Sequence, residues 1–145
     1  MPEDEFDDFV ASIQEQINDE TKAAYGQTAF ERWQHPLYVG TINDPDGYAR
    51  VRGTCGDTME IFLKFEKGRV KDARFQTDGC GASTVCGSFA AELALGKDPD
   101  EITHISGEMI NDLLGGLPEE EIHCAFLASE TLQEALHAYM RKQRA

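Results

Sequence analysis

Residues 58–77 read TMEIFLKFEKGRVKDARFQT and alternate between apolar and polar side chains. Over residues 58–66 nearly every second side chain is apolar, which is the spacing of a strand with one buried face. Phe62 is the exception, because it is a large apolar residue on the polar face. Lys67-Gly68 supplies a tight turn, and residues 70–77 return with the same period. The pattern predicts an antiparallel hairpin.

The sequence on both sides of this hairpin extends it into a small sheet followed by a helix. Residues 43–47 read NDPDG and predict a turn, and residues 48–52 predict a third antiparallel strand. After the hairpin, apolar residues recur every four positions until Gly96. This spacing predicts a helix that is capped at Ser83 or nearby.

Helical periodicity marks the remaining segments of the chain. It predicts helices over residues 6–17 and 28–34 and short helical pieces within residues 102–114. It also predicts a long final helix that begins after the acids at 119–121 and has its apolar positions within residues 128–139. The expected fold class is α+β, a small three-stranded antiparallel sheet packed by helices, with an extra N-terminal helix. Residues 1–24 are expected to form an acidic helical extension, and residues 25–145 a single domain.

Composition and charge exclude several classes of function. The chain has 145 residues, of which 13 are basic and 27 acidic, and its formal charge is -14. Such a chain repels polyanions, so a nucleic acid or an anionic membrane surface is not expected as a partner. No apolar run approaches the roughly 18 residues of a membrane span, and the start of the chain, MPEDE, lacks the order of a signal peptide. A cytoplasmic protein is therefore expected.

The four cysteines are too few for a disulfide scaffold and are expected as reduced thiols. Cys55 and Cys80 each lie beside glycines, which permit the close approach of a bound group. Cys80 precedes one predicted helix and Cys124 lies in the first turn of another, where the positive end of the helix favours thiolate. Cys86 lies on a predicted helix and is expected to face the core as a small apolar residue.

Two further side chains, Asp57 and His123, are close in sequence to these thiols. Together with three thiolates they form a mixed sulfur, oxygen and nitrogen set, which selects iron-sulfur clusters, zinc or Cu(I) over magnesium or calcium. A permanently held cluster normally has four thiolates, so a carboxylate or imidazole in the fourth place makes a more replaceable bond. Taken alone, Asp57 is better explained as the cap of a strand and His123 as a residue at a helix start. As members of the set, either could be the fourth ligand.

At this point the residues resemble a known family, the U-type iron-sulfur cluster assembly scaffolds, which comprise IscU and the N-terminal domain of NifU. The resemblance runs from about residue 33 to residue 139 and rests on ordered motifs, among them Cys55-Gly56-Asp57, Gly79-Cys80-Gly81-x-Ser83, Leu117-Pro118 and His123-Cys124-Ala125-x-Leu127-Ala128. It implies a scaffold, not an enzyme, that receives sulfur from a cysteine desulfurase. The scaffold combines this sulfur with iron as a labile cluster, usually [2Fe-2S], and passes it to apo iron-sulfur proteins.

The resemblance also implies a role for each site residue. Cys55, Cys80 and Cys124 correspond to the three thiolate ligands, Asp57 to the carboxylate that keeps the cluster exchangeable, and His123 to a neighbouring extra ligand. Cys124 corresponds to the cysteine that often accepts sulfur. Its place at the start of a predicted helix suits attack on a persulfide. Zinc can occupy the same set of ligands in the isolated protein.

Some residues depart from the family pattern. Three acids, at positions 119–121, follow Leu117-Pro118, where the chaperone-recognition stretch of the family reads Pro-Val-Lys, and this argues against delivery through an Hsp70-type chaperone. No second domain is expected after this one, so the longer, nitrogen-fixation type of the family is not expected. A zinc-dependent sulfur-acceptor branch of the family has lysine before the last cysteine, so His123 argues against membership of that branch. Two alternatives stay open: a zinc-bound sulfurtransferase or persulfide acceptor, and a structural zinc domain.

Overall fold

The structure is a computed structural model that describes residues 26–54, 56–79 and 81–144. The helix predicted over residues 6–17 lies outside the described residues, as do Cys55 and Cys80.

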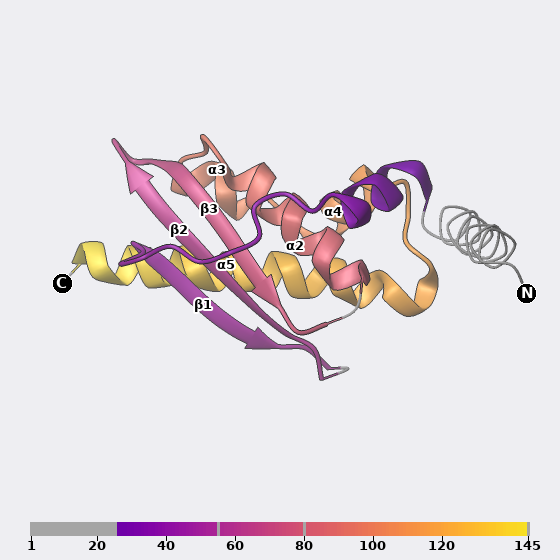
Figure 1. Ribbon diagram of the computed structural model, residues 1–145. Helices are drawn as coiled ribbons and strands as arrows, with labels where there is room; N and C mark the ends of the chain where they lie inside the picture. The colour runs from indigo at the N-terminus through magenta and orange to yellow at the C-terminus, as the bar shows by residue number, and fades with distance from the viewer. Residues whose placement is uncertain (1–25, 55, 80, 145) are drawn as a thin grey trace, which may run out of the picture.

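The centre of the fold is a three-stranded antiparallel sheet in the order β1-β2-β3 (Figure 1). Its strands are β1 (Gly47–Arg52), β2 (Thr58–Glu66) and β3 (Arg69–Thr77). Lys67 and Gly68 join β2 to β3, and both have a positive φ, 54° and 79°, as a two-residue hairpin turn requires. The predicted hairpin, the third strand and the α+β fold class are confirmed.

One face of the sheet packs against two helices, α2 (Gly81–Ala94) and α5 (Ile122–Arg144). Figure 1 shows α5 running behind the three strands. The core between these layers is made mostly of small and aliphatic side chains. It includes Met59, Ile61, Leu63, Ala73, Phe75, Val85, Cys86, Ala90, Ala128, Leu132 and Leu136, each at most 2% exposed. The apolar face predicted for β2 is therefore the buried face.

Two glycines allow the helices to approach the sheet closely. A Cβ atom on Gly47 would lie 2.4 Å from the carbonyl oxygen of Ala135 in α5. A Cβ atom on Gly87 in α2 would lie 2.5 Å from the ring of Phe75 in β3. Both separations are below van der Waals contact, so a side chain at either position would push a layer apart.

The opposite face of the sheet carries Phe62, which is only 8% exposed. The ring of Tyr48 from β1 lies 5.0 Å from that of Phe62. The Tyr48 hydroxyl donates a hydrogen bond of 2.6 Å to Glu60, and this bond to a carboxylate raises the pKa of the phenol. Figure 1 shows the chain that leads into β1 passing in front of β3 and β2. The outer face therefore contains a small aromatic cluster of its own.

The remaining described helices also follow the sequence pattern. Residues 26–34 are helical and end before Pro36, which disfavours helical geometry in the residue preceding it. Two short helices, α3 (Pro99–Thr103) and α4 (Gly107–Leu113), and a 3-10 turn, η1 (Glu119–Glu121), precede α5. Among the described residues, no helix combines the length and apolar composition of a membrane span.

The start of α2 differs from the prediction. The helix begins at Gly81, two residues before the predicted cap, so Ser83 lies inside its first turn. The Ser83 hydroxyl points to the side chains of Asp57 and Cys124, which explains why a residue of cap type occurs within the helix. Cys86 is fully buried in the core, as predicted.

Arg32 fixes helical residues 26–34 against α2. Its guanidinium donates hydrogen bonds of 3.0 Å to the hydroxyl of Ser88 and to a carboxylate oxygen of Glu92. The same group lies 3.9 Å above the centre of the Phe89 ring. These contacts place Trp33 beside the first residue of α2, close to the segments that carry the predicted ligands.

Candidate functional site

Three segments that are far apart in sequence meet beside the start of α2. Asp57 immediately precedes β2, Ser83 lies in the first turn of α2, and Cys124 lies in the first turn of α5. Because a helix start presents partial positive charge, both helices favour anionic groups at this end of the molecule. The contacts between the side chains show that these segments form one site.

Asp57, His123 and Cys124 can offer one oxygen, one nitrogen and one sulfur atom that all lie within 4.8 Å of one another. The sulfur of Cys124 is 3.6 Å from Nε2 of His123. Cys124 is fully buried, whereas Asp57 and His123 are partly exposed. The arrangement can close around a single metal ion, and its thiolate and imidazole favour a transition metal or zinc over magnesium or calcium.

The structure adds two residues that the sequence analysis did not assign to the site. The Ser83 hydroxyl lies 2.9 Å from Oδ2 of Asp57 and 3.4 Å from the sulfur of Cys124. The Cys124 thiol is also 3.7 Å from Oε2 of Glu121, to which it can donate a hydrogen bond. Glu121 precedes Cys124 by three residues, so α-helical spacing was its only sequence signal. Ser83 was expected only as a helix cap and as part of the Gly79-Cys80-Gly81-x-Ser83 motif, because its partners at the site come from other segments.

Asp57 does not act as the cap of the following strand. The first backbone N–H of β2, on Thr58, donates a 2.7 Å hydrogen bond to Asp78 instead. The carboxylate of Asp57 is thereby left to accept the Ser83 hydrogen bond at the site. The alternative in which the side chain of Asp57 caps this strand is therefore not what the structure shows.

Gly79 makes room for this arrangement. A Cβ atom on Gly79 would lie 2.7 Å from Oδ2 of Asp57 and 2.6 Å from the hydroxyl of Ser83. Gly79 is not among the residues with positive φ, so what requires glycine here is space and not backbone angle. That Cys55 and Cys80 join this site remains a prediction, because both lie outside the described residues.

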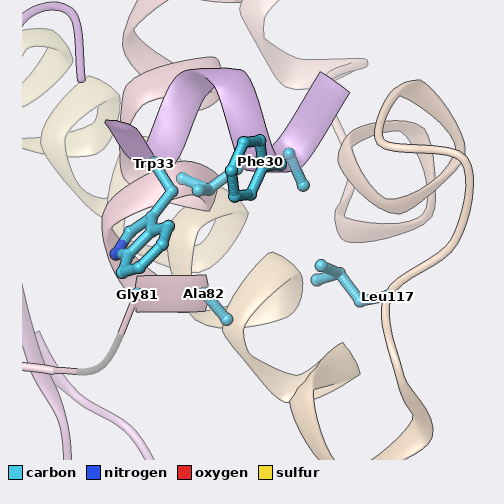
Figure 2. A pocket seen from close by; sticks show the side chains of 7 residues that line it. Phe30, Trp33, Gly81, Ala82 and Leu117 are labelled. Atoms are coloured by element: carbon cyan, nitrogen blue, oxygen red, sulfur yellow. The ribbon is translucent and has the colours of Figure 1, made fainter. Parts of the chain in front are cut away.

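An apolar pocket of about 190 Å³ adjoins the start of α2 (Figure 2). Its lining residues come from residues 26–34, from α2 and from the segment before η1. They are Ala29, Phe30, Trp33, Gly81, Ala82, Val85 and Leu117. Trp33 is 40% exposed, and a Cβ atom on Gly81 would lie 2.9 Å from the indole nitrogen. The indole therefore lies against the residue that begins α2.

Because Trp33 is the single tryptophan of the chain, its fluorescence should report metal binding at this site. Adding Co²⁺ to the reduced protein is expected to quench the emission, since the indole is in contact with α2 two residues from Ser83. A fluorescence titration measures this. In the Cys124→Ala variant the quenching should require higher Co²⁺ concentrations, and identical titration curves would contradict the assignment.

The family model and two similar relatives point to the same family of proteins. The family model described as NifU-like N terminal domain matches residues 24–145. The chain is 40% identical over 119 residues to the iron-sulfur cluster assembly scaffold protein IscU 1 of Archaeoglobus fulgidus, covering 81% of this chain and 78% of the relative. It is 33% identical over 127 residues to the iron-sulfur cluster assembly scaffold protein IscU of Escherichia coli. This match covers 84% of this chain and 98% of the relative.

A solved structure shares the fold. The NifU-like N-terminal protein from Brucella abortus superposes with a TM-score of 0.65 at 19% identity, covering 84% of this chain and 98% of the other. A second solved structure, described as a putative iron-sulfur cluster assembly scaffold protein for the SUF system of Fervidobacterium islandicum, superposes with a TM-score of 0.62 at 18% identity. The match covers 79% of this chain and 98% of the other. At these identities the likeness supports the three-stranded sheet and its helices.

Proposed function

Because the chain belongs to the NifU-like N-terminal domain family, we propose that it is a scaffold on which an iron-sulfur cluster is assembled and from which the cluster is passed to other proteins. The observation that carries this proposal is the convergence of Asp57, His123 and Cys124, whose ligand atoms lie within 4.8 Å of one another. Cys55 and Cys80 complete the proposed ligand set. Iron and the cluster, proposed as [2Fe-2S], are cargo of this site.

The chemistry of the donor set supports loose binding. Thiolate sulfur binds iron firmly, whereas a carboxylate is a harder and weaker ligand for the same metal. A set of three thiolates with Asp57 or His123 therefore lacks the fourth thiolate of a permanent cluster site. Such a site holds its cargo long enough to assemble it and still releases it to a protein that offers four strong ligands.

Cys124 is the proposed sulfur acceptor. Its thiolate attacks the outer sulfur of a persulfide on a cysteine desulfurase, a sulfur–sulfur bond forms to Cys124, and the bond to the desulfurase cysteine breaks and leaves a thiolate there. Cys124 is 0% exposed, so this transfer requires local opening of the site. We infer that contact with the desulfurase supplies the opening.

Besides the cysteine desulfurase, the proposed partners of the scaffold are the proteins that receive the cluster. The recipients are apo iron-sulfur proteins, and neither nucleic acid nor a membrane is a proposed partner of a chain with a formal charge of -14. Delivery through an Hsp70-type chaperone is not proposed, because three acids follow Pro118. We propose that residues 1–24 form an extension, that residues 25–145 form the scaffold domain, and that the protein is cytoplasmic.

Anaerobic reconstitution tests the function. The reduced protein is supplied with Fe²⁺, cysteine and a cysteine desulfurase, and its visible spectrum is recorded together with its iron and sulfide content. The proposal predicts sulfur-to-iron charge-transfer absorption, with iron and sulfide present in equal amounts. A colourless protein without bound sulfide would be incompatible with it.

Asp57→Ala is expected to slow cluster transfer by roughly tenfold, the scale of effects seen when groups around a metal are replaced. The carboxylate is the ligand that a recipient protein replaces most easily, so without it the first ligand exchange at the cluster becomes slower. Transfer to an apo-ferredoxin is followed by visible circular dichroism. Asp112→Ala, which removes an exposed acid of α4, should transfer at the wild-type rate. Equal or faster transfer by Asp57→Ala would refute the role of this carboxylate.

A zinc-bound sulfurtransferase or persulfide acceptor is the second candidate, because one sulfur, one nitrogen and one oxygen ligand also suit tetrahedral zinc. This alternative predicts a colourless protein with one tightly bound zinc ion and a persulfide on Cys124. If zinc instead had a structural role, chelation with EDTA should unfold the protein. Metal analysis, mass spectrometry after desulfurase treatment and circular dichroism with EDTA separate these outcomes from cluster assembly.

A further inference from the structure

We propose that Ser83 is a positioning residue that holds Asp57 and Cys124 together before metal enters the site. This inference rests on the proposed function, because it concerns the same ligands. It follows from one arrangement: the Ser83 hydroxyl is 2.9 Å from Oδ2 of Asp57 and 3.4 Å from the sulfur of Cys124. Ser83 therefore bridges two residues that are 67 positions apart in sequence.

The bridge matters because both partners are anionic when they act as ligands. A carboxylate and a thiolate at this separation repel each other, and the repulsion is stronger in a buried site than in water. Ser83 and Cys124 are both 0% exposed, so water reaches the pair only from the side of Asp57, which is partly exposed. A hydroxyl donor between them offsets the repulsion, since hydrogen bonds to charged groups are the stronger ones.

Local packing fixes the hydroxyl in this position. Ser83 is the third residue of α2, and its helix neighbours Ala82, Val85 and Cys86 are at most 2% exposed. Gly79 faces the hydroxyl without a side chain, and a Cβ atom there would lie 2.6 Å from it. Ser83 is thus held by a rigid element, which is the condition for keeping ligands in a productive arrangement.

The hydroxyl carries a single hydrogen, so it donates to one partner at a time. While Asp57 is not engaged with metal, the shorter contact, to Oδ2, is the better one. When the carboxylate binds metal, the same hydrogen can be donated to the sulfur of Cys124. Ser83 can therefore serve both ligands in turn without moving along the chain.

Co²⁺ binding to the full-length, reduced protein without oxygen tests the proposal. Ser83→Ala is expected to weaken Co²⁺ binding about tenfold, the scale found for groups that orient metal ligands. It should also shift the thiolate-to-cobalt charge-transfer band to longer wavelength, because a sulfur that loses one hydrogen bond gives up electron density more easily. A purely structural role for the hydroxyl would not move this band.

Ser88→Ala is the matched control. Ser88 is also a fully buried serine of α2, and its hydroxyl donates a 2.8 Å hydrogen bond to the carbonyl oxygen of Leu37, away from the site. This variant should lose stability without a change in Co²⁺ affinity or in the band. Should Ser83→Ala fail to fold, Ser83→Thr and Ser83→Val provide an isosteric pair that differs only in the hydroxyl. Threonine is then expected to retain the wild-type band and valine to lose it.

The outcomes separate this inference from the proposed function. If the wild-type protein shows the charge-transfer band and Ser83→Ala, or Ser83→Val, binds Co²⁺ with the same affinity and the same band, Ser83 has no positioning role and the scaffold proposal stands. If the wild-type protein binds no Co²⁺ through thiolate, the ligand site itself is wrong. A weaker affinity with a shifted band in Ser83→Ala, absent from Ser88→Ala, supports the inference.

Discussion

Cys124→Ala is expected to abolish the acceptance of sulfur from a cysteine desulfurase and to lower the yield of cluster by at least roughly tenfold. The reason is that one change removes a ligand and the nucleophile together, whereas even groups that only orient metal ligands affect binding by 10–100-fold. Persulfide formation is measured by mass spectrometry after desulfurase treatment, and cluster yield by visible absorption and iron content. Loss of the buried sulfur should cost only about 1 kcal/mol of stability.

Cys86→Ala is the matched control for this prediction. Both cysteines are fully buried, but Cys86 lies in the core beneath the sheet whereas Cys124 contacts the site residues. The Cys86→Ala protein should lose a similar amount of stability and assemble clusters at the wild-type yield. Persulfide that forms on Cys86, or normal cluster yield in Cys124→Ala, would show that the acceptor has been assigned to the wrong residue.

Gly79→Ala is expected to weaken metal binding at least about tenfold while changing the melting temperature little. Its Cβ atom would occupy space 2.7 Å from Oδ2 of Asp57 and 2.6 Å from the Ser83 hydroxyl, so the carboxylate and the serine must separate. Alanine tolerates the backbone here, because Gly79 does not have a positive φ. Co²⁺ titration measures the affinity, and thermal denaturation followed by far-ultraviolet circular dichroism measures the stability.

Gly87→Ala is expected to have the opposite effects, a loss of stability without a loss of metal affinity. Its Cβ atom would lie 2.5 Å from the ring of Phe75, inside the core, so overpacking should lower the free energy of unfolding by about 1–3 kcal/mol. Metal affinity should be preserved at a temperature where the variant is folded. The assignment of Gly79 to the site fails if both alanine variants lose stability equally and bind Co²⁺ equally well.

The hairpin of the sheet could be predicted from the sequence because the residues that specify it are neighbours within one short segment. Alternation over residues 58–66, the Lys67-Gly68 turn and the return over residues 70–77 specify a hairpin without reference to the rest of the chain. Helix periodicity gave α5 and placed Cys124 in its first turn for the same reason. The cap of α2 was predicted at Ser83 or nearby, because serine has the chemistry of a cap. The helix begins two residues earlier, at Gly81, and the Ser83 hydroxyl donates to Asp57, which belongs to another segment.

The site was only partly predictable, because it depends on which loops meet. Asp57, His123 and Cys124 were identified by their residue types and by the resemblance to a family, and the structure brings these three together. Sequence spacing could not reveal that Ser83 joins Asp57 to Cys124, nor that Asp78 takes over the capping of β2. It also gave no indication that Cys124 is fully buried, which is a consequence of packing between α2 and α5.

Transfer of a preassembled cluster tests most directly whether this site releases its iron-sulfur cluster to another protein. The reconstituted protein is mixed without oxygen with an apo-ferredoxin, and the visible circular dichroism of the ferredoxin is followed over time. A scaffold should lose its own absorption as holo-ferredoxin appears, with transfer that outpaces the reaction of free iron and sulfide at equal concentration. A cluster that stays on the protein, or a recipient that fills no faster than from free iron and sulfide, would contradict the proposed function.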